Sequence, residues 1–208
     1  MTNRPGRIHD RETFLERAES EVRRAQRYKR TVTVLLLEVD ERNAITAEHG
    51  EAWVEILIDI VALVCRENLR DPDVLGRYDD GVLAFVLPEA NESAGVRLAD
   101  RLTKGLSDLC LPTARGPLTF TISAGVAASV GEVAELAEIL GAAEAQLAAA
   151  HKAGGRQVRG CFVGERREYL DEALARLGRR GSDNGHDEFR SVELTPEELN
   201  LLLNSRCE

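Results

Sequence analysis

Segments with the apolar spacing of helices and of strands alternate along the first 163 residues, and this order restricts the fold more than any other feature. Residues 11–30 place apolar side chains at helical spacing, and the β-rich run TVTVLLLEV follows them. A second helix is predicted over residues 50–69, and two short strands around Asp79–Gly81 predict a hairpin. The later elements are a helix over 91–109, a strand over 118–128, a helix over 133–155 and a strand over 156–163. This order predicts an α/β domain whose sheet carries helices on its faces.

The helix predicted over residues 50–69 has an unusual polar pattern. Glu51, Glu55 and Asp59 recur every four residues and form one stripe on a helix that is otherwise apolar nearly all round. A helix with so little polar surface is normally buried. We therefore expect most of this helix to lie in the core.

The sequence changes character after Val163. Residues 164–180 form a short amphipathic pattern, a polar stretch follows, and Thr195, Pro196 and Glu198 mark the start of a last helix. We predict a first domain over residues 1–162 and a helical extension over residues 163–208, with a flexible linker over about 179–193.

Charge and cysteine usage limit the partners and the compartment. A net charge of −9 argues against general binding to nucleic acid or to anionic membranes, so a bound anion would need a local arginine cluster. There is no leader-like start and no uninterrupted apolar run of membrane-spanning length. The four cysteines have no paired spacing and are expected to be reduced, which favours a soluble cytoplasmic protein. They are Cys65, Cys110, Cys161 and Cys207.

Four strings in the same order resemble the GGDEF domain of diguanylate cyclases over roughly residues 8–160. RYDDGVLAFVLPEA resembles RYGGDEFAVLLPEA, and LLLEVDERNAITAEHGEAWVE resembles LLLDIDxFKxINDxxGHxxGD. FTISAGVAA resembles VTVSIGVA, and AEAQLAAAHKAGGRQV resembles ADxALYxAKxxGRNRV. The opening DxLTGLxNRR of the family is replaced by RIHDRETF. The resemblance implies a nucleotidyl-cyclase-like fold, with a central, mostly antiparallel sheet flanked by helices.

The resemblance also implies that catalysis is lost. The carboxylates that hold metal ions in a cyclase fall at Glu38, Gly81 and Val82, and the last two offer no ligand. The signature glycines become Asp79 and Asp80, whose charges would repel a triphosphate. The guanine-reading residues fall at Thr46 and Glu55, and the phosphate-contacting lysine falls at His151. We predict a vestigial active site without diguanylate cyclase activity, metal or cofactor.

Two explanations for the acidic turn remain open. Glu38, Asp40, Asp79 and Asp80 are hard ligands of the kind that bind Mg²⁺ or Ca²⁺. Aspartates are also common residues in turns because their side chains hydrogen-bond nearby backbone groups. We favour the second explanation.

The family's product-binding inhibitory site is retained in outline. Arg70 and Asp73 form an RxxD string five residues ahead of the signature, and Arg101 fills the third position, on the following helix, with Arg97 one turn earlier. Arginine makes forked hydrogen bonds to guanine or phosphate, and a carboxylate accepts hydrogen bonds from guanine N1 and N2. The resemblance therefore implies binding of cyclic di-GMP, although Arg70 and Asp73 could also form a plain surface ion pair.

We hypothesise a cyclic di-GMP receptor that joins two domains through a ligand dimer and signals to a protein partner. The alternatives are a scaffold that binds protein and no nucleotide, and a residual cyclase of altered specificity. The apolar residues of the last predicted helix would suit a protein contact. They are Leu199, Leu201, Leu202 and Leu203.

Overall fold

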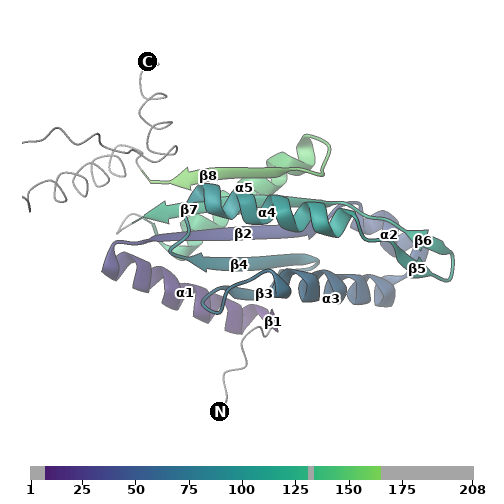
Figure 1. The fold of residues 1–208 in the computed structure, drawn as a ribbon, viewed down its shortest axis with the longest axis horizontal. Helices are drawn as coiled ribbons and strands as arrows, with labels where there is room; N and C mark the ends of the chain where they lie inside the picture. The colour runs from purple at the N-terminus through teal and green to yellow at the C-terminus, as the bar shows by residue number, and fades with distance from the viewer. Residues whose placement is uncertain (1–7, 131–133, 165–208) are drawn as a thin grey trace, which may run out of the picture. The chain divides into compact units, whose positions relative to one another are not determined.

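The computed structural model describes residues 8–130 and 134–164, which form a sheet covered by helices on both faces (Figure 1). The predicted C-terminal extension and its linker lie outside these residues. The elements in chain order are β1 (Ile8–His9), α1 (Arg11–Tyr28), β2 (Thr31–Val39), α2 (Arg42–His49), α3 (Glu51–Glu67), β3 (Val74–Asp79), β4 (Val82–Pro88), α4 (Glu92–Ser107), β5 (Leu111–Thr113), β6 (Gly116–Leu118), β7 (Ile122–Val130), α5 (Leu136–Lys152) and β8 (Val158–Val163).

The main sheet has six strands in the order β1-β3-β4-β2-β7-β8. The three pairings at its centre are antiparallel, whereas the two pairings at the edges, β1 with β3 and β7 with β8, are parallel. The predicted α/β class is confirmed, and the sheet is mixed with an antiparallel centre. Strands β5 and β6 form a separate small hairpin.

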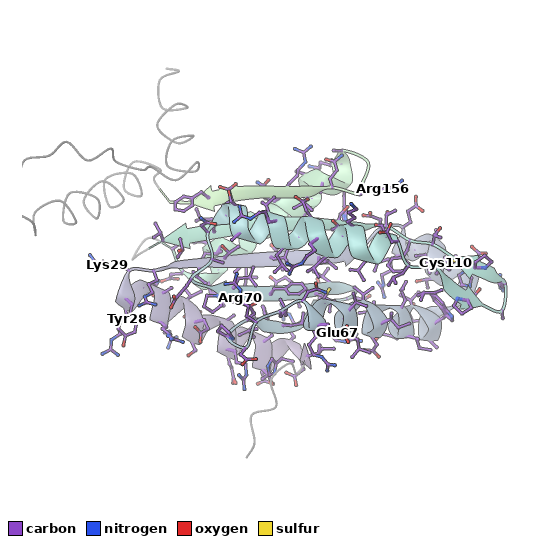
Figure 2. All side chains as sticks on the ribbon, viewed as in Figure 1. Tyr28, Lys29, Glu67, Arg70, Cys110 and Arg156 are labelled. Carbon is purple, nitrogen blue, oxygen red and sulfur yellow. The ribbon has the colours of Figure 1, made fainter. Side chains whose placement is uncertain are left out.

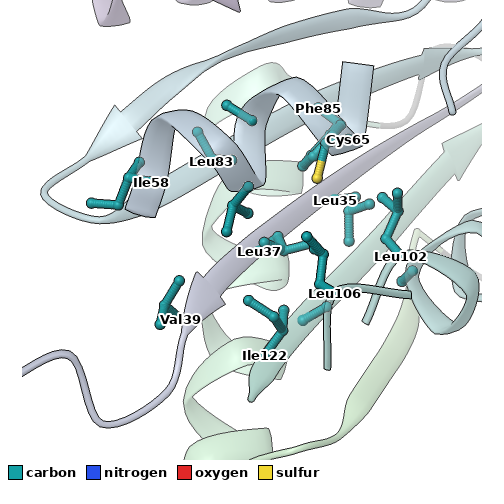
Figure 3. Close-up of a cluster of buried hydrophobic side chains, with 14 of the residues drawn as sticks. Leu35, Leu37, Val39, Ile58, Cys65, Leu83, Phe85, Leu102, Leu106 and Ile122 are labelled. Atoms are coloured by element: carbon teal, nitrogen blue, oxygen red, sulfur yellow. The ribbon is translucent and has the colours of Figure 1, made fainter. Parts of the chain in front are cut away.

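The strand β2 lies in the middle of the sheet and divides the core into two layers. Leu35, Leu37 and Val39 face one layer, where they pack with α3 and α4 (Figure 3). Val34 and Leu36 face the other layer, where they pack with α1 and α5. Side chains of a strand alternate between faces, so one run of β-forming residues supplies both cores.

The packing of α5 against β7 requires a glycine. A Cβ at Gly125 would lie 2.2 Å from the carbonyl oxygen of Ala143 and 2.4 Å from the backbone nitrogen of Leu147. The backbones of helix and strand are therefore too close for any side chain at this position. This close approach brings the C-terminal turn of α5 to the end of β2.

Short elements were missed by the sequence prediction. The two-residue β1, the eight-residue α2 and the three-residue strands β5 and β6 have no apolar periodicity long enough to detect.

The prediction for α3 was correct in part. Its inner face is buried, but Ile56 is 54% exposed and Leu63 is 45% exposed. Glu51, Glu55 and Asp59 of the polar stripe pair with arginines of neighbouring elements. The outer surface of α3 consists of this stripe and of the exposed Ile56 and Leu63. This arrangement leaves apolar side chains in water.

The register of the sheet defines its two ends, the hairpin end and the loop end. At the hairpin end, β2 finishes beside the turn between β3 and β4, since Glu38 is paired with Val82. At the loop end, β2 begins and the loop of residues 68–73 leads from α3 into β3.

Candidate functional site

The turn of the β3–β4 hairpin carries Asp79 and Asp80 on the surface. The carboxylate of Asp79 accepts a hydrogen bond from the backbone N–H of Asp80 at 2.8 Å. It is a local side-chain-to-backbone bond of an aspartate in a turn, one residue shorter than the bond of an Asx turn. Gly81 has a φ of +79° and, like Val82, offers no side-chain ligand.

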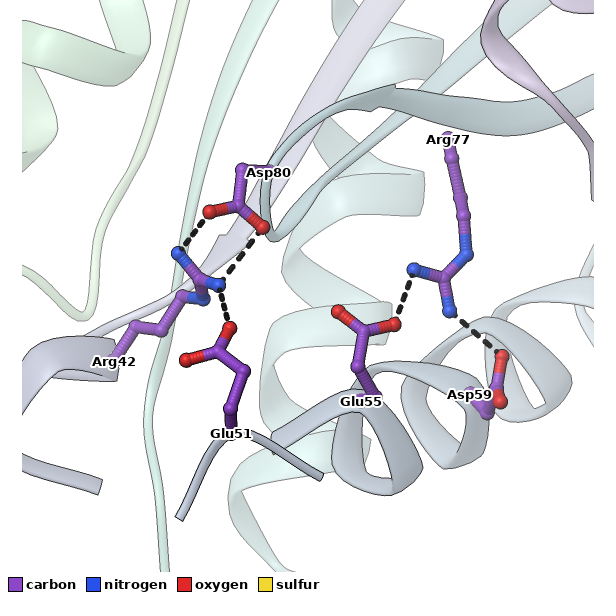
Figure 4. Close-up of polar contacts among 6 residues, drawn as sticks. All are labelled: Arg42, Glu51, Glu55, Asp59, Arg77 and Asp80. Atoms are coloured by element: carbon purple, nitrogen blue, oxygen red, sulfur yellow. Dashed lines mark hydrogen bonds and ion pairs between the residues drawn. The ribbon is translucent and has the colours of Figure 1, made fainter. Parts of the chain in front are cut away.

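Arg42 neutralises the acidic groups beside this turn (Figure 4). Its two terminal nitrogens donate to the two carboxylate oxygens of Asp80 at 2.7 and 2.8 Å, and one of them also donates to Glu51 at 2.8 Å. The Arg42 side chain is only 17% exposed, so it lies under the turn rather than in solvent. Forked pairs of this geometry are among the stronger ion pairs in proteins.

Arg77 pairs in the same way with the other acids of α3. It donates to Glu55 and to Asp59, both at 2.9 Å (Figure 4). Partial burial lowers the pKa of Arg77, but the hydrogen bonds that Arg77 donates to these carboxylates outweigh that effect and the pKa is raised overall. Glu55, which the family resemblance aligns with a guanine-reading residue, is therefore engaged by an arginine of its own domain.

Within residues 8–130 and 134–164, one group of side chains has the composition and spacing of a metal site. Carboxylate oxygens of Glu51, Glu55 and Asp80 lie within 4.8 Å of one another. Arg42 or Arg77 contacts each of the three, so their charge is already balanced by cations of the protein. The alternative metal set from the sequence is not gathered, since Asp40 and Asp80 turn toward different partners.

Asp40 forms a buried structural junction at the hairpin end. Its carboxylate accepts hydrogen bonds from the hydroxyls of Thr121 and Ser123, both at 2.6 Å, and from the backbone N–H of Arg156 at 3.0 Å. These donors belong to the start of β7 and to the loop between α5 and β8. Asp40 therefore ties three parts of the chain together.

The His151 imidazole lies between Glu38, the last residue but one of β2, and Asp40, which directly follows β2. Its Nε2 is 3.6 Å from Glu38 and 3.5 Å from Asp40. Partial burial raises the pKa of Glu38, and the nearby imidazole opposes that rise. The position that carries a phosphate-contacting lysine in the family resemblance is therefore directed at carboxylates in this chain.

The loop of residues 68–73 holds the second predicted site. The carboxylate of Asp73 accepts a hydrogen bond from the backbone N–H of Arg70 at 2.8 Å, and the N–H of Asp73 donates to the carbonyl of Arg70 at 3.0 Å. These two bonds fix a tight turn and leave the Arg70 side chain exposed. Partial burial raises the pKa of Asp73, whereas the Arg70 N–H and the Arg70 charge oppose the rise.

Helix α4 brings Arg101 to the same loop. Its guanidinium donates to the carbonyl of Asn68, the C-terminal cap of α3, at 3.1 Å. Arg101 therefore contacts the loop that carries Arg70 and Asp73; Figure 2 labels Arg70 in this loop. Arg97 is exposed on α4 four residues before Arg101, which places the two arginines on the same side of the helix.

The sequence prediction missed the roles of Arg42 and Arg77. A signal for them did exist, because a row of three acids on one helix face attracts cations. The sequence does not reveal which arginines supply them, because Arg77 is 22 residues from Glu55 and 18 from Asp59 in the chain.

A family comparison agrees with this fold. The domain described as "Diguanylate cyclase, GGDEF domain" matches residues 6–157, which is more than half of the 208-residue chain. The chain belongs to the GGDEF family.

Curated relatives include diguanylate cyclases. The chain is 28% identical over 127 residues to the diguanylate cyclase DgcP of Pseudomonas aeruginosa, covering 61% of this chain and 19% of DgcP. It is 26% identical over 156 residues to the probable diguanylate cyclase DgcC of Escherichia coli, covering 74% of this chain and 42% of DgcC. The chain thus spans less than half the length of these relatives.

Solved structures share the fold at low identity. The GGDEF domain of DgcB from Caulobacter crescentus, in complex with c-di-GMP, matches with a TM-score of 0.70 at 19% identity, covering 76% of this chain and 92% of that one. The diguanylate cyclase SiaD of Pseudomonas aeruginosa, in complex with its activator SiaC, matches with a TM-score of 0.70 at 21% identity, covering 74% of this chain and 59% of that one.

None of the helices within residues 8–130 and 134–164 has the length and apolar character needed to cross a membrane.

Proposed function

We propose that this GGDEF domain binds cyclic di-GMP and does not synthesise it. The ligand would contact Arg70, Asp73 and Arg101, with Arg97 as a further cation. The observation that carries the proposal is the position of Arg101, whose hydrogen bond to Asn68 holds it at the loop that presents Arg70 and Asp73.

The chemistry of this loop suits the ligand. Arg101 uses one N–H for Asn68 and has five in all, so several donors remain for guanine O6 and N7 or for phosphate oxygens. The exposed guanidinium of Arg70 can also stack on a purine. Asp73 can accept hydrogen bonds from guanine N1 and N2. Cyclic di-GMP carries two guanines and two phosphates, so it matches both the cations and the carboxylate.

Loss of catalysis is supported by the contacts at the hairpin end. A metal ion and a triphosphate would have to displace Arg42 from Asp80 and Glu51, and Arg77 from Glu55. Gly81 and Val82 would supply no ligand in return, and His151 contacts acids rather than a phosphate. The balance favours the internal ion pairs.

The receptor proposal extends to signal output. A ligand dimer bound at two such loops would join two copies of the domain, and a protein partner would respond to the pair. Each half of this step is separately measurable, by the oligomeric state with and without ligand and by capture of the partner.

A non-nucleotide-binding scaffold is the second candidate. The exposed Ile56 and Leu63 on the outer side of α3 favour it, because large apolar side chains on one helix face are typical of protein contacts. The carboxylate of Asp73 is also already used by the Arg70 N–H, so the RxxD string has a purely structural role available to it.

Calorimetric titration with cyclic di-GMP separates the two candidates. The unmodified protein should bind at micromolar ligand, and Arg101→Ala should weaken binding roughly ten- to hundredfold. Asp79→Gly with Asp80→Gly is the matched control, because it changes charged residues of the vestigial site and should leave affinity unchanged. Absence of binding by the unmodified protein would favour the scaffold.

A second assay addresses the residual cyclase. Incubation of the full chain with GTP and Mg²⁺ or Mn²⁺ should give no cyclic di-GMP above a protein-free blank. Restoring the glycines and acids of the signature with D79G, D80G, G81D and V82E should not create activity, since Thr46 and Glu55 remain at the guanine-reading positions. Metal-dependent product from the unmodified chain would overturn the loss of catalysis while leaving the binding proposal to be judged by calorimetry.

A further inference from the structure

The C-terminal end of α1 and the residues that follow carry a concentration of positive charge, here called the basic end. Five of the eight residues from 23 to 30 are cationic, and all five are exposed. They are Arg23, Arg24, Arg27, Lys29 and Arg30. Tyr28 stands among them with 58% of its surface exposed, and the Arg27 guanidinium lies 5.6 Å from the centre of its ring.

The basic end and the acidic hairpin turn lie at opposite ends of β2. The basic end lies where β2 begins, whereas Glu38, Asp40, Asp79 and Asp80 lie where it finishes. The net charge of −9 therefore hides a local excess of cations at one end of the sheet. A protein with this separation of charge turns its basic end toward an anionic surface.

The ion pairs within this region leave the excess largely intact. Arg23 pairs with Glu19, Arg24 with Glu21, and Arg30 with Glu89. All three arginines are more than half exposed, and exposed pairs of this kind are weak and screened by salt. Arg23, Arg24 and Arg30 are thus held only loosely by their carboxylates.

A structural role explains part of this pattern and not the rest. Basic residues near the end of a helix stabilise its dipole, but that effect is confined to the last turn. Arg23 and Arg24 lie before that turn, and an exposed tyrosine gives the helix dipole nothing. Lys29 has a φ of +50°, which ends the helix and directs the following chain into β2.

We propose that the basic end contacts the surface of a membrane that contains anionic lipid. Clusters of roughly 4–8 Lys and Arg residues on a helix are attracted to anionic lipids, and tyrosine favours the interface between headgroups and acyl chains. The contact is peripheral and reversible. It departs from the expectation drawn from net charge, which takes no account of where the charges lie.

The size of the patch favours lipid over nucleic acid. The helical part of the patch, residues 23–28, spans only about 8 Å along the helix axis. Even a single DNA-binding module buries roughly 600–1,000 Å² of protein surface and draws its affinity from many phosphate contacts. One helix end is too small for that, whereas a membrane presents anionic headgroups at any spacing.

Vesicle sedimentation of the full chain tests the proposal. The protein should sediment with vesicles of mixed phosphatidylglycerol and phosphatidylcholine at low salt, and not with phosphatidylcholine alone. The triple variant Arg23→Gln, Arg24→Gln, Arg27→Gln should lose about fivefold for each cation removed, which is on the order of a hundredfold in total. Melting curves of each variant establish that it is folded.

The control removes the same charge elsewhere. Arg17, Arg115 and Arg159 are also exposed, and their joint change to glutamine should leave vesicle binding within a few-fold of the unmodified protein. No sedimentation of the unmodified protein, or equal losses in the two triple variants, would overturn the proposal. Binding of a single-stranded oligonucleotide that depends on Arg23, Arg24 and Arg27 more strongly than vesicle binding does would assign the patch to nucleic acid instead.

Discussion

The hairpin end and the loop end of the domain both carry arginine beside carboxylate, but they use the pair differently. At the hairpin end, Arg42 and Asp80 bond side chain to side chain in a forked pair. At the loop end, Asp73 bonds to the backbone N–H of Arg70, and Arg101 bonds to a backbone carbonyl. The first arrangement satisfies charge with charge, whereas the second uses uncharged backbone groups and leaves guanidinium donors for another partner.

This difference distinguishes a structural cluster of charges from a candidate ligand site. The presence of Arg and Asp in the right order does not decide the matter, because both ends have them. The deciding feature is whether the charged groups already face one another. By that measure, the charged groups of the hairpin end are satisfied within the domain, whereas those of the loop end keep donors for a ligand.

The largest expected effect comes from Asp40, which should matter for stability and not for binding. Asp40→Ala removes three hydrogen bonds to a buried carboxylate and leaves the hydroxyls of Thr121 and Ser123 without their acceptor. We expect the free energy of unfolding to fall by about 3 kcal/mol or more. Urea denaturation measures this loss.

A ligand titration of the same variant completes the comparison. At temperatures where Asp40→Ala is folded, it should bind cyclic di-GMP as the unmodified protein does. A loss of affinity in the folded variant would show that the hairpin end and the loop end are coupled and do not act independently.

At the loop end, Arg70 and Asp73 should separate binding from stability. Arg70→Ala keeps the backbone N–H that Asp73 accepts, so unfolding should change by less than about 0.5 kcal/mol while affinity falls by about 1.5–3 kcal/mol. Asp73→Ala removes the turn bond as well, so both quantities should fall. If Arg70→Ala leaves affinity intact, the RxxD string has only its structural role.

Much of the fold was predictable, for reasons that particular residues illustrate. The long run of β-forming residues in β2 and the apolar stripe of α1, with Phe14, Ala18 and Val22 buried, are extensive enough to identify each element. By contrast, β5 and β6 have three residues each and contain a proline apiece, so no period can develop. Local pattern identifies long elements because each repeat adds evidence, and short elements lack repeats.

The candidate site was predictable in its residues but not in its contacts. Family resemblance indicated Arg70, Asp73 and Arg101, and the structure places all three at one loop. The family resemblance gave no indication that Arg42 would lie under the turn, or that His151 would contact Glu38 and Asp40. Such contacts depend on side-chain directions between distant segments, which only the packed sheet fixes.

A smaller effect is expected for Arg42, and it would measure how far the hairpin end has become structural. Asp80 is 68% exposed and Glu51 is 61% exposed, so solvent screens both pairs. Arg42→Ala should therefore lower the free energy of unfolding by only about 1 kcal/mol. A double-mutant cycle with Asp80→Gly isolates the pair, and a coupling near zero would show that the contact contributes nothing.

The smallest effect at neutral pH concerns the protonation of Asp73. Partial burial raises the pKa of this carboxyl above its ordinary value of 3.8, so it takes up a proton at a higher pH than an exposed aspartate. The carboxylate has two oxygens that can accept from guanine N1 and N2, whereas the protonated acid has an O–H donor in place of one acceptor. Affinity should therefore weaken as the pH falls through this raised pKa, by up to tenfold per pH unit. Stability moves in the opposite direction. Because the folded pKa is the higher one, this group stabilises the fold fully below the unfolded pKa and loses that contribution as the pH rises through the folded pKa.

Asp73→Asn removes both dependences, so the difference between the variant and the unmodified protein isolates Asp73 from Glu38, whose pKa is also raised. An affinity that stays flat across this window, while stability still shifts, would mean that the Asp73 carboxylate serves the turn and does not contact the ligand.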